Sequence, residues 1–381
     1  MKKRILIDAT TVIDKVDGLS TYIINLLRNL PAESFGVFDY IILVHTGPVR
    51  PELAALLMDN RFTVIKKNIA PIGPKREWDM LWFLKKYRKS FDLFHSTSNY
   101  YPMFLKGGVA TVHDITFRKY FNAPWWSFNM APRFLSFITR NGLYRAKAVI
   151  AVSNFTKQDL AESFNLSNKI KNKIEIIYEG WEHLQPEAGE EITNETPLQF
   201  ENYLLYVGTT RLHKNMKTLL KALSLAKDNL PKQISIVVCG NASYLDMDDK
   251  KNIDVINAGG ERIFFTGFVS KSVLEQLFRN ADAFIFPSLS EGFGIPVLES
   301  FYFEKPLLCS NTTSLPEIAG DAALYFNPEN PENIAEAIVA FYKDASLGST
   351  MISKGNERLK LFSWKKTAAE TIALYKKVLG L

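Results

Sequence analysis

Short apolar runs alternate with amphipathic segments along almost the whole chain, and this alternation constrains the fold more than any other feature. Runs such as 4–9, 40–45 and 148–152 are bounded by turns, while segments such as 20–29 and 77–89 repeat apolar residues at helical spacing. Strands that lack a polar face are typical of a parallel sheet with helices on both faces. The pattern therefore predicts an α/β fold with doubly wound parallel sheets.

The alternation is interrupted once, by an acidic and polar segment that contains Pro186 and Pro197. Such a segment is typical of a linker between domains. The alternation then restarts and ends in an amphipathic helix over 364–379. At 381 residues the chain is long enough for two domains. We predict a first domain over 1–184, a linker over 185–202, a second domain over 203–362 and a C-terminal helix over 363–381 that packs back on the first domain.

Several protein classes are disfavoured by the apolar runs and by the cysteines. The chain has no apolar run near the roughly 18 residues that a membrane-spanning helix needs. Asp8 interrupts the first apolar run too early for a signal peptide. Cys239 and Cys309 each follow a strand-like run, which predicts two buried free thiols in a reducing compartment. The expected location is the cytoplasm.

The positive charge is concentrated in the first half of the chain. Residues 1–183 hold 26 Lys and Arg against 16 Asp and Glu, whereas residues 184–381 hold 20 against 24. The segment 118–147 has six basic residues, no acidic residue and several aromatic ones, among them Trp125, Trp126, Phe128, Phe134 and Phe137. A solvated face over buried aromatics and a peripheral contact with the anionic inner face of a membrane both fit this composition. Nucleic acid is not expected as a partner, because the chain has no nucleic-acid-binding motif.

One segment combines two carboxylates with a glycine turn. The apolar run 283–286 is followed by Glu291, the turn Gly292-Phe293-Gly294, an apolar helix that begins near Ile295, and Glu299. A strand, a glycine turn and a helix start present backbone N–H groups and a positive dipole end to an anion. Glu299 is expected about two helical turns from Glu291 on nearly the same face. One carboxylate then reaches a sugar and the other a ribose hydroxyl.

Three other glycine or histidine segments follow predicted strands. Gly208 is followed by Arg211 and by Lys214 at a helix start, which suits a diphosphate. His113 ends an apolar run, where a polar side chain reaches the carboxyl edge of a sheet. Gly18 precedes the first helix, for which the nearby Ser20 is also a favourable N-cap.

The string P-S-x-x-E-G-F-G-x-P-x-x-E over 287–299 resembles the E-x7-E motif of a large retaining glycosyltransferase family of the GT-B fold, which includes many bacterial mannosyl- and rhamnosyltransferases. The resemblance extends over most of the chain and implies two Rossmann-like domains that face each other across a deep cleft. It also implies a nucleoside-diphosphate sugar as the donor. The residues that it assigns to catalysis are His113 and Glu291, and those that it assigns to donor binding are Gly18, Arg211, Lys214, Val269, Gly292, Phe293, Gly294, Ile295 and Glu299.

The resemblance also implies a role for most of these side chains. His113 would lie under the donor sugar, Glu291 would orient sugar hydroxyls, and Glu299 would bind the ribose. Arg211 and Lys214 would grip the diphosphate together with the helix start. The loop at Val269 would touch the base through its backbone. No metal is expected, because these positive groups would stabilise the leaving diphosphate.

The chain departs from the family pattern at three places. The family arginine more often lies directly after the glycine or beside the lysine, where this chain has Thr209 and His213. The family often has two glycines before the first helix, and here one of them is Asp17. A glycine usually ends the glutamate helix, whereas Glu304 occupies that stretch here and is expected to adopt a left-handed conformation or to let the helix end differently.

The predicted function is a retaining hexosyltransferase that uses a nucleoside-diphosphate sugar, with GDP-mannose favoured. The expected acceptor is a glycan or a lipid-linked glycan in the synthesis of surface polysaccharide such as lipopolysaccharide. UDP-sugars and dTDP-rhamnose remain open as donors. A nucleotide-sugar 2-epimerase and a non-catalytic nucleotide-sugar-binding protein remain open as other classes. A dehydrogenase is disfavoured, because no G-x-G-x-x-G follows a strand.

Overall fold

The computed structural model describes residues 2–13, 17–70, 73–120, 131–185, 200–230, 234–240, 242–258 and 262–381. The chain forms two compact units, one of Met1–His183 with Phe362–Leu381 and the other of Leu184–Leu361. Most of the expected linker, and Trp125, Trp126 and Phe128 of the basic segment, lie outside the described residues. Within the described part of the chain, no helix is long and apolar enough to cross a membrane.

The first unit is built on a seven-stranded parallel sheet in the order β3-β2-β1-β4-β5-β6-β7. Its strands are β1 (Lys3–Asp8), β2 (Phe38–His45), β3 (Phe62–Lys67), β4 (Leu93–Ser96), β5 (Val109–Val112), β6 (Ala148–Ala151) and β7 (Ile174–Ile176). Every residue of β4, β5 and β6 is buried, as the apolar runs predicted. The strand order changes direction between β1 and β4, and at such a point ligands bind beyond the carboxyl ends of the strands.

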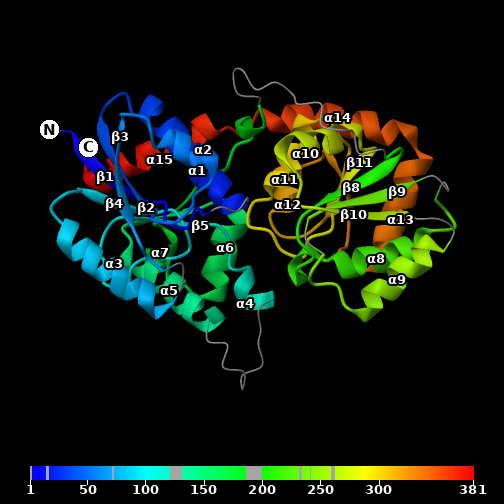
Figure 1. Cartoon of the computed structure of the whole chain (residues 1–381), viewed down its shortest axis with the longest axis horizontal. Helices are drawn as coiled ribbons and strands as arrows, with labels where there is room; N and C mark the ends of the chain where they lie inside the picture. Colours follow the sequence, from blue (N-terminus) through cyan, green and yellow to red (C-terminus); the bar gives the residue numbers. More distant parts are fainter. Residues whose placement is uncertain are drawn as a thin grey trace. The chain divides into compact units, whose positions relative to one another are not determined.

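Helices cover both faces of this sheet (Figure 1). They are α1 (Gly18–Glu33), α2 (Pro51–Leu56), α3 (Pro74–Tyr87), α4 (Thr116–Tyr120), α5 (Ala131–Arg145), α6 (Asn154–Ser163), α7 (Asn168–Lys171) and α15 (Trp364–Leu379). On one face α1 and α15 pack on Ile5 and Ile7, and on the other α3, α5 and α6 pack with Leu6. The alternation of Ile5, Leu6 and Ile7 between the two faces follows from the two-residue period of a strand.

The N-terminus of α1 differs from the expectation that Ser20 caps it. Asp17 is the N-cap, and its carboxylate accepts a hydrogen bond from the Ser20 backbone N–H at 2.7 Å. The Ser20 hydroxyl returns the bond by accepting from the Asp17 backbone N–H at 3.2 Å. A carboxylate satisfies the free N–H groups of a first helical turn and also favours its positive dipole end, so the helix starts two residues earlier at Gly18.

The helix α15 is separated in sequence from the rest of the first unit, yet it completes that unit's core. Trp364 and Tyr375 are fully buried among residues of α1 and the sheet. The Glu182 carboxylate accepts from the Trp364 backbone N–H at 2.8 Å and thereby helps to cap the helix. The Tyr375 hydroxyl lies 2.5 Å from Nδ1 of His95 in β4.

The second unit is built on a six-stranded sheet in the order β10-β9-β8-β11-β12-β13, in which all neighbouring strands are parallel. Its strands are β8 (Tyr203–Val207), β9 (Ser235–Cys239), β10 (Ile263–Gly267), β11 (Ala283–Phe286), β12 (Leu307–Ser310) and β13 (Ala323–Phe326). Its α-helices are α8 (Met216–Ala226), α9 (Met247–Asn257), α10 (Lys271–Asn280), α11 (Ile295–Tyr302), α12 (Leu315–Ala319), α13 (Pro331–Lys343) and α14 (Ala345–Leu359). Cys239 and Cys309 end or lie in strands of this sheet as buried free thiols, as predicted.

Candidate functional site

Three neighbouring strands of the second unit reach glycines with positive φ at their carboxyl ends. Gly208 after β8, Gly240 after β9 and Gly267 at the end of β10 have φ of 149°, 144° and 71°. A Cβ on Gly240 would lie 2.0 Å from the Gly208 carbonyl oxygen, so the two loops approach each other as closely as backbone allows. Glycines allow the backbones of these loops to approach each other, and the Gly208 N–H donates to the Cys239 carbonyl at 2.9 Å. Sequence reasoning missed Gly240, although it follows an apolar run as Gly208 does.

Lys214 and Glu291 come together beside this edge. The Lys214 Nζ lies 2.7 Å from Oε1 of Glu291, and both side chains retain some exposure, 21% and 14%. The Lys214 Nζ also lies 5.3 Å from the centre of the Phe286 ring, at the end of β11. The Leu289 backbone N–H donates to the His213 carbonyl at 2.7 Å and joins the two loops that carry the pair. The structure thus unites two residues that the sequence motifs had selected separately.

The loop after β12 holds Glu291 in place. The Glu291 backbone N–H donates to the Thr313 hydroxyl at 3.2 Å, and the Ser314 hydroxyl contacts the carbonyls of Glu291 and Phe293 at 3.0 and 2.9 Å. Thr313 has a φ of 60°, which is rare for a β-branched residue. Sequence reasoning missed Thr313 and Ser314, although the polar run 310–314 directly after a buried strand was a signal.

The helix α11 begins at Ile295, as predicted, so only the second half of the stretch from Glu291 to Glu299 is helical. Gly294 has a φ of 98°, and Pro296 lies in the first turn, so residues up to Gly294 form a turn rather than helix. Glu299 is therefore about one helical turn into α11, and the expectation of two turns between the glutamates was wrong. The start of α11 remains a favourable place for an anion, because its first backbone N–H groups lack helical partners.

Glu299 is near the end of β9. Burial raises the pKa of the Cys239 thiol, and the negative charge of Glu299 raises it further. Glu299 lies in α11, four residues after its first residue. The helix ends with Glu304 at a φ of 55°, which confirms the left-handed conformation considered for this position.

Arg211 and Val269 lie in loops at the carboxyl ends of β8 and β10. Arg211 is exposed, and its guanidinium carbon lies 6.0 Å from the centre of the Tyr244 ring. The Thr210 hydroxyl accepts from the Tyr244 backbone N–H at 3.1 Å, which fixes the ring beside Arg211. Val269 is partly buried in the loop between β10 and α10, next to the exposed Phe268.

In the first unit, both ring nitrogens of His113 have partners within that unit. Nδ1 lies 3.2 Å from Oε1 of Glu179, and Nε2 lies 3.1 Å from the carbonyl oxygen of Thr97. Tyr22 of α1 contacts the imidazole edge to face, with the ring centres 4.7 Å apart. A hydrogen bond from His113 to a sugar hydroxyl therefore requires that one of these two bonds is exchanged. Sequence reasoning missed Glu179.

His95, in β4, is a core residue. It is fully buried, with Nδ1 2.5 Å from the Tyr375 hydroxyl and Nε2 2.8 Å from the Thr111 hydroxyl. Burial, helped by the positive charge of His113, lowers its pKa to about 3. The ring is therefore neutral at neutral pH and serves to join α15 to the sheet.

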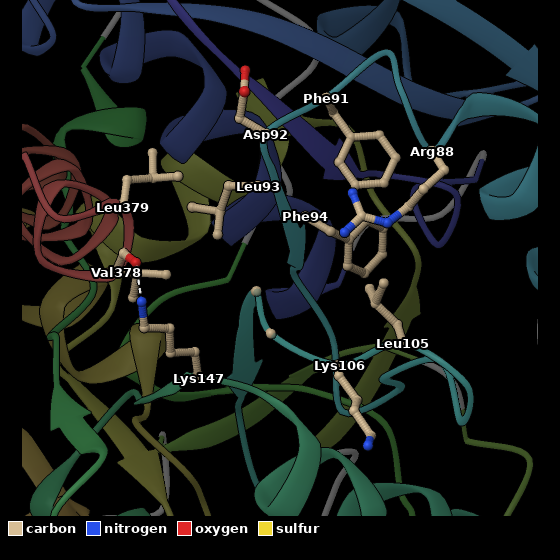
Figure 2. Close-up of a pocket in the computed structure, with 12 residues that line it drawn as sticks. Arg88, Phe91, Asp92, Leu93, Phe94, Leu105, Lys106, Lys147, Val378 and Leu379 are labelled. Atoms are coloured by element: carbon tan, nitrogen blue, oxygen red, sulfur yellow. Dashed lines mark hydrogen bonds between the residues drawn. The ribbon is translucent and has the colours of Figure 1, made fainter.

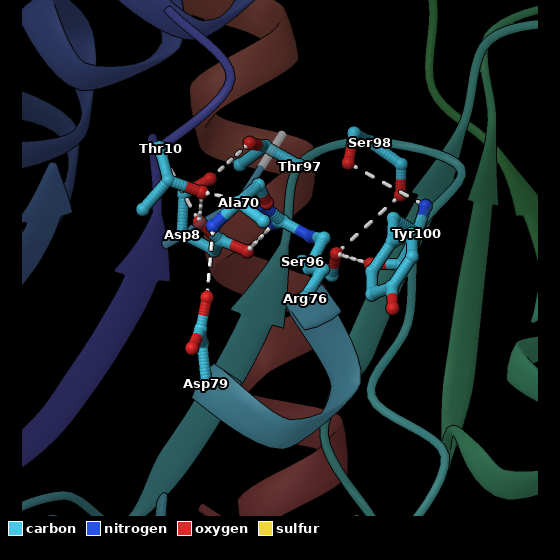
Figure 3. Close-up of polar contacts among 9 residues, drawn as sticks. All are labelled: Asp8, Thr10, Ala70, Arg76, Asp79, Ser96, Thr97, Ser98 and Tyr100. Carbon is cyan, nitrogen blue, oxygen red and sulfur yellow. Dashed lines mark hydrogen bonds and ion pairs between the residues drawn. The ribbon is translucent and has the colours of Figure 1, made fainter. Parts of the chain in front are cut away.

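A buried ion pair organises the carboxyl ends of β1 and β4 (Figure 3). Arg76 of α3 donates to the carboxylate of Asp8 at 2.7 Å and to the Thr10 hydroxyl at 3.0 Å. The Thr97 hydroxyl donates to the Asp8 carbonyl at 2.5 Å. Because removal of one partner leaves a buried charge unpaired, this pair fixes the position of α3 strongly. Gly18, which was expected to bind the donor, is the first residue of α1. Residues 14–16, shortly before it, are outside the described part of the chain.

Comparisons with known proteins identify both units. The model of glycosyl transferases group 1 matches residues 190–358, and the model of glycosyltransferase family 4 matches residues 16–182. The O-antigen chain mannosyltransferase B of Escherichia coli is 28% identical over 308 residues, which cover 80% of this chain and 78% of that protein.

Two solved structures resemble the whole chain. Sucrose-phosphate synthase from Thermosynechococcus elongatus has a TM-score of 0.74 at 18% identity over 100% of both chains. HepE from Anabaena, in complex with UDP and glucose, has a TM-score of 0.73 at 17% identity over 98% of this chain and 99% of that one. At these identities the likeness shows the fold, which is the GT-B fold. The chain therefore belongs to the group 1, or family 4, glycosyltransferases, a family of retaining hexosyltransferases that bind nucleotide-sugar donors.

Proposed function

We propose that this glycosyltransferase transfers mannose from GDP-mannose to a glycan or lipid-linked acceptor during the synthesis of a surface polysaccharide. The observation that supports mannose is the similarity to an O-antigen chain mannosyltransferase over most of both chains. The expected E-x7-E string and the lysine loop lie together in the second unit, which supports a diphosphate site there.

In the proposed site, Lys214, Arg211 and the first N–H groups of α11 bind the diphosphate. Lys214 pairs with Glu291 in the structure. A bound diphosphate would accept hydrogen bonds from the Lys214 ammonium and weaken its pairing with Glu291. The Glu291 carboxylate could then accept hydrogen bonds from sugar hydroxyls. Glu299 of α11 would bind the ribose, and the backbone near Val269 would contact the base.

The proposed reaction keeps the configuration at the anomeric carbon. The bond between that carbon and the diphosphate oxygen breaks while the acceptor oxygen bonds to the same face. The acceptor proton passes to the leaving diphosphate. Positive groups that are already oriented toward the diphosphate lower the free energy of this charge development, and no covalent enzyme intermediate is required.

A thermal-melting panel tests the donor. GDP-mannose, UDP-glucose, UDP-GlcNAc and dTDP-rhamnose are each added to the protein at equal concentration. A donor at one hundred times its dissociation constant adds about 2.7 kcal/mol to the free energy of unfolding, which is readily visible as a shift in Tm. The proposal expects the largest shift with GDP-mannose, and a larger shift with any other donor would contradict the assignment of mannose.

A matched pair of variants localises the response. Lys214→Gln should abolish most of the shift, whereas Lys217→Gln removes an equal charge from the next turn, where the lysine pairs with Asp246. Equal losses in both variants would mean that net charge, rather than the proposed site, determines binding. Transfer is then measured with the responding donor and membrane extracts as a source of acceptor, and product configuration is read by NMR of the anomeric proton.

HepE, whose structure holds UDP and glucose, supports a second candidate. A UDP-hexose donor would be assigned if UDP-glucose or UDP-GlcNAc gave the dominant shift. A protein that binds donor with high affinity but transfers no sugar to any acceptor, and does not hydrolyse the donor, would instead be a nucleotide-sugar-binding protein.

A further inference from the structure

Two helices of the first unit each expose a stripe that mixes basic and aromatic side chains. The helix α3 exposes two tryptophans, Trp78 and Trp82, with 61% and 64% of their surface accessible. The helix α5 exposes Phe137 and Tyr144, at 54% and 46%. The α3–α5 face is defined here by Lys75, Trp78, Trp82, Lys85, Lys86 and Lys89 and by Arg133, Phe137, Arg140 and Tyr144, all of them exposed.

The spacing of these residues places each set on one side of its helix. Within α3, from Lys75 to Lys86, the intervals are three, four, three and one residues, and within α5, from Arg133 to Tyr144, they are four, three and four. Lys89 follows the end of α3. At about 100° per residue such intervals keep the side chains within one stripe. Exposed aromatic residues on surface helices are usually single, so two aligned pairs, each flanked by cations, form an unusual surface.

Neither carboxylate of α3 is classed as exposed, because Glu77 is buried and Asp79, which borders the stripe, is partly buried. Glu77 is buried, and its carboxylate accepts from the Met103 backbone N–H at 2.9 Å. Asp79 accepts from the Ala70 backbone N–H at 3.0 Å, as Figure 3 shows. The sequence of α5 contains no acidic residue. Among the described residues of the two helices, the exposed charges are therefore all positive.

The two helices pack on the same face of the sheet. Met80 and Phe83 of α3 and Leu143 of α5 belong to one hydrophobic cluster. Figure 1 shows α3 and α5 on the same side of the sheet. The opposite side of each helix, which carries the aromatic residues, consequently faces away from the core on that side of the unit.

The loop between β4 and β5 extends this surface. It carries Phe104, which is 58% exposed, and Lys106. Beside it a cavity of about 220 Å³ is lined by Arg88 from the turn after α3 and by Lys147 from the end of α5, and Figure 2 shows these side chains around it. The carboxylate at this cavity belongs to Asp92, which pairs with Lys3 and Arg4.

We infer that the α3–α5 face binds a bilayer that contains anionic lipid. Tryptophan and tyrosine rings favour the depth of lipid headgroups, where one part of the ring is apolar and another is hydrated. Lysine and arginine beside them are attracted by anionic headgroups. A polynucleotide would match the charge, but the sequence has no nucleic-acid-binding motif.

This inference goes beyond the proposed transfer reaction and holds for any donor sugar. It also revises the location of the membrane contact expected from sequence. That expectation used the segment 118–147 alone, of which 121–130 is outside the described residues. The structure adds α3, whose tryptophans and lysines were assigned only to a basic helix by the sequence pattern.

Flotation with lipid vesicles tests the inference on the full-length protein. Vesicles of phosphatidylcholine with about one third phosphatidylglycerol should bind the protein at low salt, and pure phosphatidylcholine vesicles should bind it far more weakly. Binding should fall as sodium chloride is raised toward about 0.5 M, because the screening length becomes shorter than the face. Binding that is independent of salt and of anionic lipid would overturn the inference.

Charge variants separate this face from net charge. Lys85→Gln with Lys86→Gln should weaken partition into anionic vesicles about 25-fold, since each lysine near the surface contributes about fivefold. Lys251→Gln with Lys360→Gln removes the same charge from two exposed lysines of the second unit, 72% and 67% accessible. The control pair should change partition less than about twofold. Equal effects of the two pairs would contradict a localised face.

Aromatic variants test the second requirement. Trp78→Ala with Trp82→Ala should reduce vesicle binding about tenfold or more at unchanged net charge. Met58→Ala with Val255→Ala removes two exposed apolar side chains elsewhere and should leave binding unchanged. Tm measurements confirm that each variant is folded, and donor-induced shifts should be equal to those of the parent protein.

Two further outcomes would overturn the inference. Binding to a single-stranded oligonucleotide that is lost in the lysine variants, without vesicle binding by the parent, would assign the face to nucleic acid. A dimer of the parent protein that dissociates in the tryptophan variants, again without vesicle binding, would assign it to a second copy of this chain.

Discussion

Glu179 places its carboxylate oxygen 3.2 Å from Nδ1 of His113, while the Thr97 carbonyl lies 3.1 Å from Nε2 of the same ring. Both partners accept hydrogen bonds, so both ring nitrogens are best satisfied when each carries a proton. Burial by itself lowers the pKa of His113, but the bond and charge of Glu179, with smaller contributions from Thr97 and Asp114, raise the pKa above 6.5. The arrangement favours a cationic imidazole in the first unit.

Glu179→Gln should therefore lower the pKa of His113. An amide cannot supply the negative charge, and burial then dominates. The ring should titrate below its pKa in the parent protein, as measured by the chemical shifts of the imidazole carbons over a pH series. An unchanged pKa would show that Glu179 does not hold the charge.

The same change has a defined effect on stability. A histidine whose pKa is raised on folding stabilises the protein fully below the unfolded value near 6.5, and this contribution is lost as pH rises through the folded pKa. As pH rises from 6 to a value above the pKa of His113 in the folded protein, the Tm of the parent protein should therefore fall further than the Tm of Glu179→Gln. If both lost Tm equally over that range, the linkage would be refuted.

His95 should show the opposite dependence on pH. Its pKa of about 3 in the folded protein lies below the ordinary value of 6.5, so the unfolded chain takes up a proton that the folded chain does not. Stability contributed by neutral His95 is lost as pH falls from 6.5, at up to about 1.4 kcal/mol per pH unit. His95→Gln should lose less Tm between pH 6.5 and 5 than the parent protein, although its Tm at pH 7.5 should be lower.

Glu291→Gln should leave the fold intact and reduce transfer by about two to three orders of magnitude, because the amide cannot accept hydrogen bonds from sugar hydroxyls with the strength of a carboxylate. The Tm without donor should change little, since the Glu291 carboxylate is partly exposed and its ion pair is with Lys214, which is also partly exposed. Initial rates of transfer at saturating donor provide the measurement. Unaltered transfer would exclude a catalytic role for Glu291.

Gly294→Ala should destabilise the second unit. Its φ of 98° is unfavourable for alanine, and the added Cβ would lie 2.8 Å from Cδ2 of Leu315. The expected cost is about 1–3 kcal/mol, which corresponds to several degrees of Tm. Gly267→Ala is the matched control, because it also has positive φ, at 71°, but open space around its Cβ. A smaller loss for Gly294→Ala than for Gly267→Ala would contradict the role assigned to the contact with Leu315.

Much of the second unit could be predicted from sequence because its strands are short and wholly apolar. The apolar runs 203–207, 283–286 and 323–326 of the sequence coincide with β8, β11 and β13. The first helix was predicted too short, because its early turn lacks the apolar period and is defined by the Asp17 cap. The helices α4, α6, α7 and α12 were not anticipated because they have ten residues or fewer and leave little periodic signal. The longer helices α5, α13 and α14 bury residues at helical spacing, a signal that sequence reasoning missed.

Site residues that belong to one sequence motif could be predicted. Contacts between loops that are distant in the sequence could not. Lys214 and Glu291 each belong to a recognisable string, but their ion pair depends on how the loops after β8 and β11 pack. Glu179 and Thr313 lie far in sequence from the residues that they support, and no local pattern marks them. His95 lies within β4 and is buried against Tyr375 of α15, whereas His113 follows the last residue of β5 and keeps some exposure.

The position of α15 has a consequence for biosynthesis. Trp364 and Tyr375 fill the core of the first unit, but the ribosome makes them after the entire second unit. The nascent first unit thus has an open hydrophobic surface over α1 during most of translation, while the second unit already has all of its own strands. The order of folding during synthesis should therefore run against the order of the sequence, and a ribosome that stalls before residue 364 would release a first unit that exposes this surface to chaperones and proteases.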